Sequence, residues 1–498
     1  LSKLNPKDTK KLLVFADSVQ DASHRAGYYN ARTFRFNFRT AIQSYLKTLK
    51  GDPDMVGLAA PFLSHWKKIL GDDKAAATFC PSDLSGTDIY EEFFEKKNDQ
   101  LWNLLLPRTQ WEFYLEYSLR SQVGRTLEKT LSSAAYIPAD ILARVAQRIY
   151  QKAANHHEFV RQCSSQDFTH LIFGILERSL IRGCVGFSFF EQYREKESAW
   201  ELDKTREGLE WISRLPKGRI DGSEVGALPK FISFDSKAKI FDFAGTLDRG
   251  DNWFTFWFKK HFKFDTNRTY SRSDIGPFYK LLMSELESDG ILNSVVGKGH
   301  IKNYGIKPEL IKISTDIVAL ECDACAHKTV VPANEVAQYR NMGCVITHCK
   351  GRFSKVIPSK STYYRDIYES GDIERIFATE HTGLLSRKRR EALETEFKQS
   401  DTKLRRPDNV NLLSCTPTLE MGIDIGDLSA TVVGALPRSA ASYQQQIGRA
   451  GRKSGSAMVI AVAQSRPRDL LYFQYPEELI AGNIEPPGCF LDAPDIIK

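Results

Sequence analysis

Short apolar runs alternate with helical stretches near both ends of this 498-residue chain. The run Leu12–Ala16 ends at polar Asp17 and Ser18, just before a predicted helix start at Gln20. Continuous runs of this kind are typical of parallel strands that are buried on both faces. Four more strands are predicted at 374–381, 410–415, 430–436 and 457–463. The alternation predicts an α/β fold whose parallel sheet is covered by helices on both faces.

Helical periodicity dominates elsewhere. Between residues 386 and 399, Leu393 and Phe397 share one face and charged residues fill the rest, as in a surface helix. From about 34 to 216 the pattern is mainly helical, most clearly over 141–154. Basic and aromatic residues alternate where this region begins; they are Arg32, Phe34, Arg35, Phe36, Phe38 and Arg39. They suit either a bound single strand or a packed element with one solvated face, and we favour packing.

A different pattern covers residues 217–314. A helix is predicted from Ser271 through Leu286, and Asp289-Gly290 ends it. Two short strands follow around a turn at 298–300 that contains lysine, glycine and histidine. This order resembles a winged-helix domain, which places a helix in a groove and a wing on the nucleic-acid backbone. A purely structural winged helix is an equally good interpretation.

Composition narrows the class of protein. The net charge of +7 and the pI near 8.7 permit a polyanionic partner without establishing one. No apolar run reaches the roughly 18 residues needed to span a bilayer, so we expect no membrane partner. Nine sparse cysteines favour a reducing, cytoplasmic location. Five of them are isolated and are expected to be packing residues: Cys80, Cys163, Cys184, Cys415 and Cys489.

The other four cysteines have metal-ligand spacing. Cys322 and Cys325 are separated by two residues, which lets both thiolates reach one tetrahedral Zn²⁺. Cys344 and Cys349 form a wider second pair, where His348 is an alternative ligand. We favour four cysteines, because glycines beside the second pair indicate turns. Four thiolates make a structural rather than a catalytic zinc site. Free cysteines are the remaining alternative.

Candidate ligand-binding residues lie near the C-terminus. The predicted strand ending at Cys415 leads into a polar turn with Thr416, Gly422 and Asp424. Then comes Gln445-Gln-Ile-Gly-Arg-Ala-Gly-Arg452, in which Arg449 and Arg452 are three residues apart, the spacing of neighbours on one helical face. Glycines allow close backbone approach, and guanidinium groups suit phosphate oxygens. The alternative for the arginines alone is a solvated basic helix end.

These two segments resemble motifs V and VI of superfamily-two helicases, and the turn after Leu12–Ala16 resembles motif IV. The resemblance implies the second RecA-like lobe of such an enzyme. It places Gly422, Asp424 and Gln445 at ATP, and Arg449 and Arg452 as arginine fingers. Such fingers stabilise charge on the transferring phosphoryl group. It places the remaining two candidates, Ser18 and Thr416, at nucleic-acid phosphates.

The distance between motifs IV and V, nearly four hundred residues, indicates a large insertion into this RecA-like lobe. The predicted domains are 1–33 and 366–475 for the lobe, 34–216 helical, 217–314 winged-helix-like, 315–365 zinc-ribbon-like, and 476–498 as a C-terminal extension. The fold class is therefore α/β, with a RecA-like parallel sheet that is interrupted by these inserted segments.

Half of an ATPase site is missing from the sequence. Neither a G-x-x-x-x-G-K-[S/T] phosphate loop nor an Asp-Glu dipeptide for Mg²⁺ occurs. We expect the chain to be a fragment whose first RecA-like lobe lies upstream, so that ATP and Mg²⁺ bind with that lobe and this chain alone is inactive. The alternative is a non-enzymatic nucleic-acid-binding or scaffold module. A nuclease that uses the Cys/His cluster is a weaker alternative, because no matching carboxylates accompany it.

The combined features are similar to large bacterial DEAD/DEAH-type helicases of DNA repair and anti-phage defence. These features are Phe15-Ala-Asp-Ser-Val-Gln-Asp-Ala22, Glu380-His-Thr-Gly-Leu-Leu385, the winged-helix pattern and the four cysteines. The likeness implies an ATP-dependent helicase or translocase. It favours DNA over RNA, and it leaves room for other defence or repair proteins as partners.

Overall fold

The protein consists of two compact units. Unit 1 comprises Leu1–Phe36 and Glu374–Lys498, and unit 2 comprises Asn37–Ile373. The computed structural model describes 11–119, 125–198, 217–220, 223–226, 228–235, 238–245, 251–262, 272–358, 360–399, 405–417, 425–426, 428–452, 455, 457–482 and 484. Among the helices in these ranges, none has both the length and the apolar character needed to cross a bilayer.

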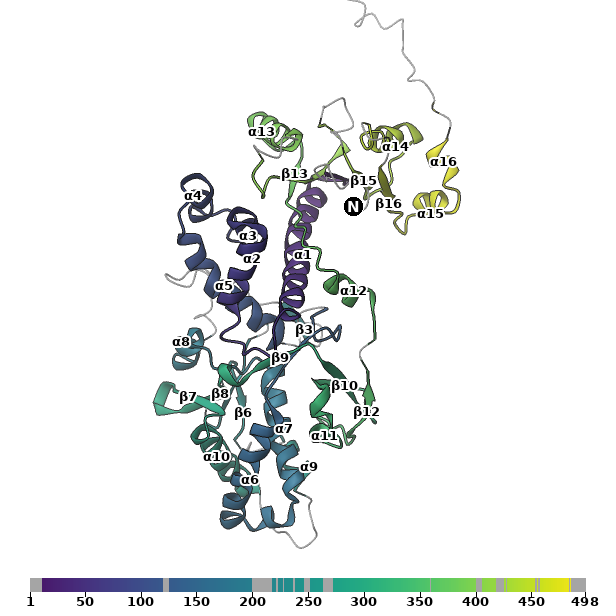
Figure 1. Cartoon of the computed structure of the whole chain (residues 1–498). Coiled ribbons are helices and arrows are strands. Elements are labelled where there is room, and N and C mark those ends of the chain that lie inside the picture. Colours follow the sequence, from purple (N-terminus) through teal and green to yellow (C-terminus); the bar gives the residue numbers. More distant parts are fainter. Residues whose placement is uncertain are drawn as a thin grey trace, which may run out of the picture. The chain divides into compact units, whose positions relative to one another are not determined.

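A five-stranded parallel sheet forms the centre of unit 1 (Figure 1). In the sheet Leu12 pairs with Leu412 on one side and with Ala430 on the other, so the first strand of the chain is the middle strand. All five predicted strands are confirmed, as is the parallel arrangement. Their order is β13 (Ala378–His381), β14 (Leu412–Cys415), β1 (Leu12–Phe15), β15 (Ala430–Val433) and β16 (Met458–Ala461).

Helices cover this sheet through apolar side chains. The predicted amphipathic helix is confirmed as α13 (Arg387–Lys398), in which Leu393 and Phe397 are buried. Phe397 joins Phe15 of β1 in one buried cluster. The other helices of unit 1 are the start of α1 (Val19–Leu46), α14 (Ala440–Ile447), α15 (Pro467–Gln474) and α16 (Glu477–Ile480).

The outer strand β16 departs from the expectation of a sheet covered on both faces. All four of its residues are exposed, and Ile460 is 42% accessible. Within the described residues β16 pairs only with β15 and neither of its faces is covered; the edge position alone is not sufficient, because the opposite edge strand β13 keeps Ala378 and His381 buried. Apolar composition alone does not distinguish an edge strand from a central one.

Unit 2 begins with the helical region that the periodicity predicts. The helix expected at 141–154 is α6, and it is slightly longer than expected. The helices of this region are α2 (Ala59–Leu70), α3 (Asp72–Phe79), α4 (Asp88–Lys96), α5 (Gln100–Tyr117), α6 (Ala139–His156), α7 (Ser165–Ile181) and α8 (Glu191–Glu195). Later helices are α9 (Trp253–His261), α10 (Arg272–Ser288), α11 (Val336–Tyr339) and α12 (Tyr363–Glu369).

The alternating basic and aromatic residues of α1 serve packing. Phe38 lies with its ring centroid 5.7 Å from that of Phe62 and 5.5 Å from that of Phe113. Arg39 is buried, and its Nε lies 2.9 Å from Oε2 of Glu116. A guanidinium paired in this way does not face solvent. The packing interpretation is confirmed for Phe38 and Arg39, whereas Arg32 and Arg35 are exposed.

Small sheets complete unit 2. The predicted order of a helix followed by two strands is confirmed by α10, β7 and β8. Two unpredicted strands extend this hairpin to a sheet of order β6-β5-β8-β7. The strands of unit 2 are β2 (Ala134–Tyr136), β3 (Lys217–Ile220), β4 (Ser223–Gly226), β5 (Phe231–Ser233), β6 (Phe241–Phe243), β7 (Leu292–Val296), β8 (Lys302–Ile306), β9 (Lys312–Ser314), β10 (Ile317–Cys322), β11 (Lys328–Pro332) and β12 (Phe353–Ile357).

A buried arginine ties α8 to the β7–β8 hairpin. Arg194 is 1% exposed, and burial lowers its pKa to about 10. Its guanidinium donates to Oδ1 of Asn303 at 2.8 Å and to Oδ1 of Asn293 at 2.9 Å. It also donates to the backbone oxygens of both asparagines and lies 4.6 Å from the ring centre of Phe231. These amide oxygens take the place of a carboxylate partner.

Replacing Arg194 with methionine is expected to destabilise unit 2 by about 3 kcal/mol, because the amide oxygens then stay buried without a donor. Urea unfolding followed by tryptophan fluorescence measures this, since all seven tryptophans of the sequence lie between residues 37 and 373 and so report on unit 2. The control is Arg144→Met, whose side chain is 76% exposed. Equal stability of the two variants would contradict the role of Arg194.

Candidate functional site

Ser18 and Thr416 lie at the carboxyl edge of the parallel sheet. Ser18 follows β1, and its Oγ accepts a hydrogen bond from the backbone N–H of Asp21 at 3.1 Å, which caps α1. Thr416 follows β14, the neighbouring strand, and is 6% exposed. The backbone N–H of Ala16 donates to the oxygen of Cys415 at 2.8 Å, which holds the two strand ends together. Ligands of open parallel sheets bind at this edge.

Two further cations at this edge were not among the sequence candidates. Arg25 donates to Asp21 at 2.6 Å and to the backbone oxygen of Gly434 at 3.2 Å, so it links α1 to the end of β15. A Cβ atom at residue 434 would lie 2.8 Å from the backbone oxygen of Phe15 and would also displace the Arg25 guanidinium, so glycine is favoured there. Nη2 of Arg466 lies 3.3 Å from Oδ2 of Asp17. The spacing of four between Asp21 and Arg25 was the available sequence signal; nothing local marks Arg466.

The two arginines of the C-terminal motif lie in the turn after α14. The helix ends at Ile447, and the backbone N–H of Gly451 donates to the oxygen of Leu428 at 3.0 Å. Arg449 is 7% exposed. Arg452 is exposed, and its Nε donates to the backbone oxygen of Gly448 at 2.9 Å. The arginines therefore have different surroundings instead of continuing one helical face.

The structure describes only some of the predicted ATP-binding residues. Gln445 is exposed on α14, whereas the next residue, Gln446, is 2% exposed. Gly422 and Asp424 lie outside the described residues. Of the predicted ATP-binding residues, the structure therefore describes only Gln445, which lies on α14 four residues before Arg449.

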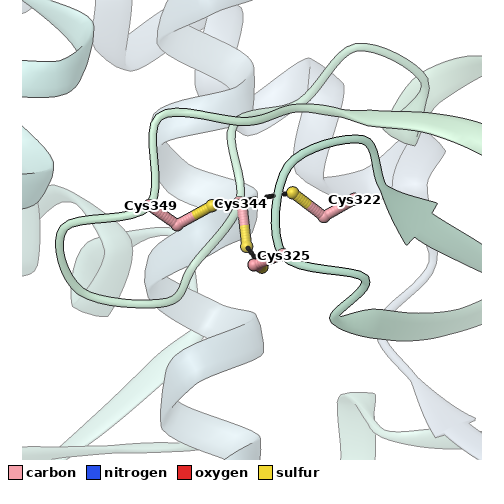
Figure 2. A group of neighbouring side chains, drawn as sticks. All are labelled: Cys322, Cys325, Cys344 and Cys349. Carbon is pink, nitrogen blue, oxygen red and sulfur yellow. Dashed lines mark hydrogen bonds between the residues drawn. The ribbon is translucent and has the colours of Figure 1, made fainter.

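The four predicted metal ligands come together in unit 2 (Figure 2). Sγ of Cys322 lies 3.6 Å from that of Cys349, and Sγ of Cys325 lies 3.6 Å from that of Cys344. All four sulfur atoms lie within 4.8 Å of one another. A tetrahedral Zn²⁺ with bonds of about 2.3 Å requires sulfur atoms about 3.8 Å apart. The arrangement is compatible with a structural zinc ion.

The surroundings of the sulfur atoms favour four cysteine ligands over a set with His348. Backbone N–H groups of Ala324 and Gly351 point at the sulfurs of Cys322 and Cys349, at 3.5 and 3.4 Å. The ring of His348 lies 5.5 Å from that of Phe256, and this histidine is outside the group of convergent ligand atoms. Burial and the nearby thiols raise the pKa of Cys344, so four thiolates together need a cation.

Helix α9 holds the second cysteine pair. Nζ of Lys260 donates to the backbone oxygens of Cys344 at 3.0 Å, Cys349 at 2.9 Å and Gly351 at 3.2 Å. Trp253 donates from Nε1 to the oxygen of Val345 at 2.7 Å. The lysine fixes the loop and brings one positive charge to a site where four thiolates exceed the charge of Zn²⁺. No sequence motif marks Lys260 as a contact of the cysteine loop.

Part of the chain matches a known domain family. Residues 349–454 match the family described as helicase conserved C-terminal domain. This match contains β13, β14, β15 and the arginine turn. Together with the parallel sheet, this match is consistent with a RecA-like helicase C-terminal domain in this part of the chain.

Three curated relatives are similar to parts of the chain. The Druantia protein DruE of Escherichia coli is 27% identical over 216 residues, 39% of this chain and 11% of that protein. The ATP-dependent helicase HRQ1 of Saccharomyces cerevisiae is 40% identical over 75 residues, 15% of this chain and 7% of that protein. The uncharacterized ATP-dependent helicase YprA of Bacillus subtilis is 41% identical over 85 residues, 17% of this chain and 11% of that protein.

The chain thus spans about a tenth or less of the length of these relatives. Among solved structures, the DUF1998 helicase MrfA bound to DNA and AMPPNP is 30% identical over 24% of this chain and 16% of that chain, with a TM-score of 0.19.

Proposed function

We propose that this chain is the C-terminal helicase portion of an ATP-dependent helicase or translocase that acts on DNA. The observation that carries the proposal is the arginine turn, 449–452, which directly follows α14 inside the region that matches the helicase C-terminal domain. The preference for DNA rests on the resemblance of the sequence motifs, and so do the roles in DNA repair or anti-phage defence.

In this proposal ATP binds between unit 1 and a first RecA-like lobe of the same protein. That lobe supplies the phosphate loop and the carboxylate for Mg²⁺, and the metal neutralises charge on the phosphates. Arg449 and Arg452 stabilise the charge that develops on the transferring phosphoryl group. Gln445 faces the nucleotide, and Gly422 and Asp424 lie near its ribose.

The carboxyl edge of the sheet contacts the nucleic acid. Ser18 and Thr416 follow adjacent strands and offer hydroxyl groups to phosphate oxygens. The N-terminal end of α1 adds backbone N–H groups and the positive end of the helix dipole to the same edge. Closure and reopening of the two lobes, driven by ATP, move the strand stepwise past these contacts.

Unit 2 supplies a scaffold and a second contact surface. The four cysteines bind a structural Zn²⁺ in a zinc-ribbon-like segment. Helix α10 and the β7–β8 hairpin form a winged-helix domain, in which the exposed Lys298 and Lys302 of the wing lie against the nucleic-acid backbone.

The test is ATP hydrolysis by the full-length protein with and without single-stranded DNA, double-stranded DNA and RNA. We expect hydrolysis that DNA stimulates at least tenfold and RNA does not, because lobe closure on the strand completes the site. Absence of hydrolysis in a protein that still binds DNA would favour the non-enzymatic binding module. Equal stimulation by RNA would overturn the preference for DNA.

A further inference from the structure

Three basic side chains gather in unit 2 where α7 ends and β5 begins. Arg178 and Arg182 are four residues apart, the spacing that brings side chains to one face of a helix. The backbone N–H of Lys230 donates to the oxygen of Arg182 at 3.0 Å, so the chain before β5 lies against the helix end. Asp242 lies on β6, which pairs with β5. The cluster is therefore built from three separate segments.

Among the described residues, Asp242 is the carboxylate of this cluster, and it is already engaged. Arg178 donates to Asp242 from Nε at 2.7 Å and from Nη2 at 3.1 Å, a two-pronged ion pair. The same guanidinium lies 4.6 Å from the ring centre of Trp253. Arg178 is thus fixed in place by two partners. Three cations against one carboxylate leave the cluster with a net charge of +2.

The other two cations lack partners within the described residues. Nε of Arg182 is buried and has no hydrogen-bond acceptor, although the side chain as a whole is only half-buried. No ion pair to Arg182 or Lys230 occurs in the described part of the chain, and Lys230 is also half-buried. Burial lowers the pKa of both groups and the neighbouring arginines lower it further, whereas the carboxylate of Asp242 raises it. A buried donor without an acceptor is unfavourable, so this arrangement suits a bound anion.

We propose that Arg178, Arg182 and Lys230 form a binding site for a backbone phosphate of a nucleic-acid strand. A guanidinium fork and an ammonium group together match the oxygens of a phosphodiester. The partly buried position strengthens the attraction relative to a fully solvated one. The choice of a nucleic acid as the source of the phosphate rests on the proposed function. The site itself is separate from the sheet edge and the arginine turn of unit 1.

The test is binding of a fluorescein-labelled 20-nucleotide single strand to the 498-residue chain without ATP, followed by fluorescence anisotropy between 50 and 200 mM salt. The double variant Arg182→Gln/Lys230→Gln is expected to bind about tenfold more weakly. Its salt dependence, the slope of log K against log salt concentration, is expected to fall by about 0.7, which corresponds to one lost phosphate. Because ATP is absent, failure of the arginine-finger proposal leaves this measurement unaffected.

The matched control is Lys96→Gln/Lys97→Gln on α4, which removes the same charge from exposed lysines of the same unit. If the control variant binds the oligonucleotide equally weakly, the effect is one of long-range charge, and the proposed site is overturned. Unchanged binding by the Arg182/Lys230 variant would overturn it as well. A second experiment measures the melting temperature of the native chain and of the double variant with inorganic phosphate. If phosphate stabilises only the native chain while the variant still binds the oligonucleotide normally, the site binds free phosphate. That result would overturn the nucleic-acid assignment.

Stability separates this role from a structural one. Because the cations repel one another, the double variant is expected to melt at the same or a higher temperature than the native chain, as measured by tryptophan fluorescence. A lower melting temperature would instead make Arg182 a structural residue and overturn the proposal for it. In that case the single variant Lys230→Gln, which leaves the helix end intact, decides whether a phosphate binds. A phosphate site predicts that this variant also binds the oligonucleotide more weakly.

Discussion

Replacing Arg452 with alanine is expected to lower the ATP hydrolysis rate of the full-length protein about a thousandfold or more, with DNA binding almost unchanged. An arginine finger acts on charge that exists only in the transition state, so its removal slows the reaction without weakening the bound strand. The exposed Arg452 makes its hydrogen bond to the backbone of Gly448, and truncation should leave the lobe folded. Steady-state hydrolysis and oligonucleotide anisotropy measure the two effects.

The matched control for this variant is Arg387→Ala on α13, where the side chain is 86% exposed and pairs with Glu391. We expect its ATP hydrolysis to remain within about twofold of native. An unimpaired Arg452→Ala enzyme would contradict the finger assignment. Arg449 requires a milder change because it is 7% exposed: Arg449→Lys keeps the charge and removes the guanidinium fork.

Replacing Cys344 with serine is expected to lower the zinc content from about one equivalent to less than half and to unfold part of unit 2. A serine hydroxyl stays protonated at neutral pH and is a poor zinc ligand, while structural Zn²⁺ contributes on the order of 10 kcal/mol or more to folding of such segments. Metal analysis gives the zinc content. Tryptophan fluorescence reports the unfolding, because Trp253 donates to the neighbouring Val345.

Cys163→Ser is the control for the zinc prediction. Cys163 is buried but lies outside the group of convergent cysteines, so we expect this variant to keep its zinc. A native protein that contains less than about half an equivalent of zinc would contradict the four-cysteine site. So would a Cys344→Ser variant that binds zinc as tightly as the native chain.

Local pattern and motif spacing were sufficient to predict the strands, the amphipathic helix and the four convergent cysteines. Leu12–Phe15 is apolar without interruption and Leu412–Cys415 is interrupted only by Ser414, because both strands lie inside the sheet. The exposure of β16 escaped this reasoning, since an edge strand and a central strand have the same composition. The pattern favoured packing for Arg39 but could not name its partner, because Glu116 is distant in sequence.

The residues that the sequence could not predict act through long-range contacts. Lys260 belongs to an amphipathic helix, and only the folded chain shows that it binds the loop of the second cysteine pair. Arg194 is an ordinary charged residue until two asparagines a hundred positions away enclose it. That Nε of Arg182 has no acceptor among the described residues is likewise invisible without the structure. In each case the decisive partner lies on an element that the local pattern does not connect.

The central position of β1 has a consequence for synthesis on the ribosome. Both neighbours of this strand, β14 and β15, lie some four hundred residues downstream. At about 5–20 residues per second, β1 emerges about 20 to 80 seconds before it can pair. The inserted unit can fold during that interval, while an apolar segment with two open edges waits. Chaperone protection of the nascent β1 segment is therefore expected to govern the yield of this protein in cells.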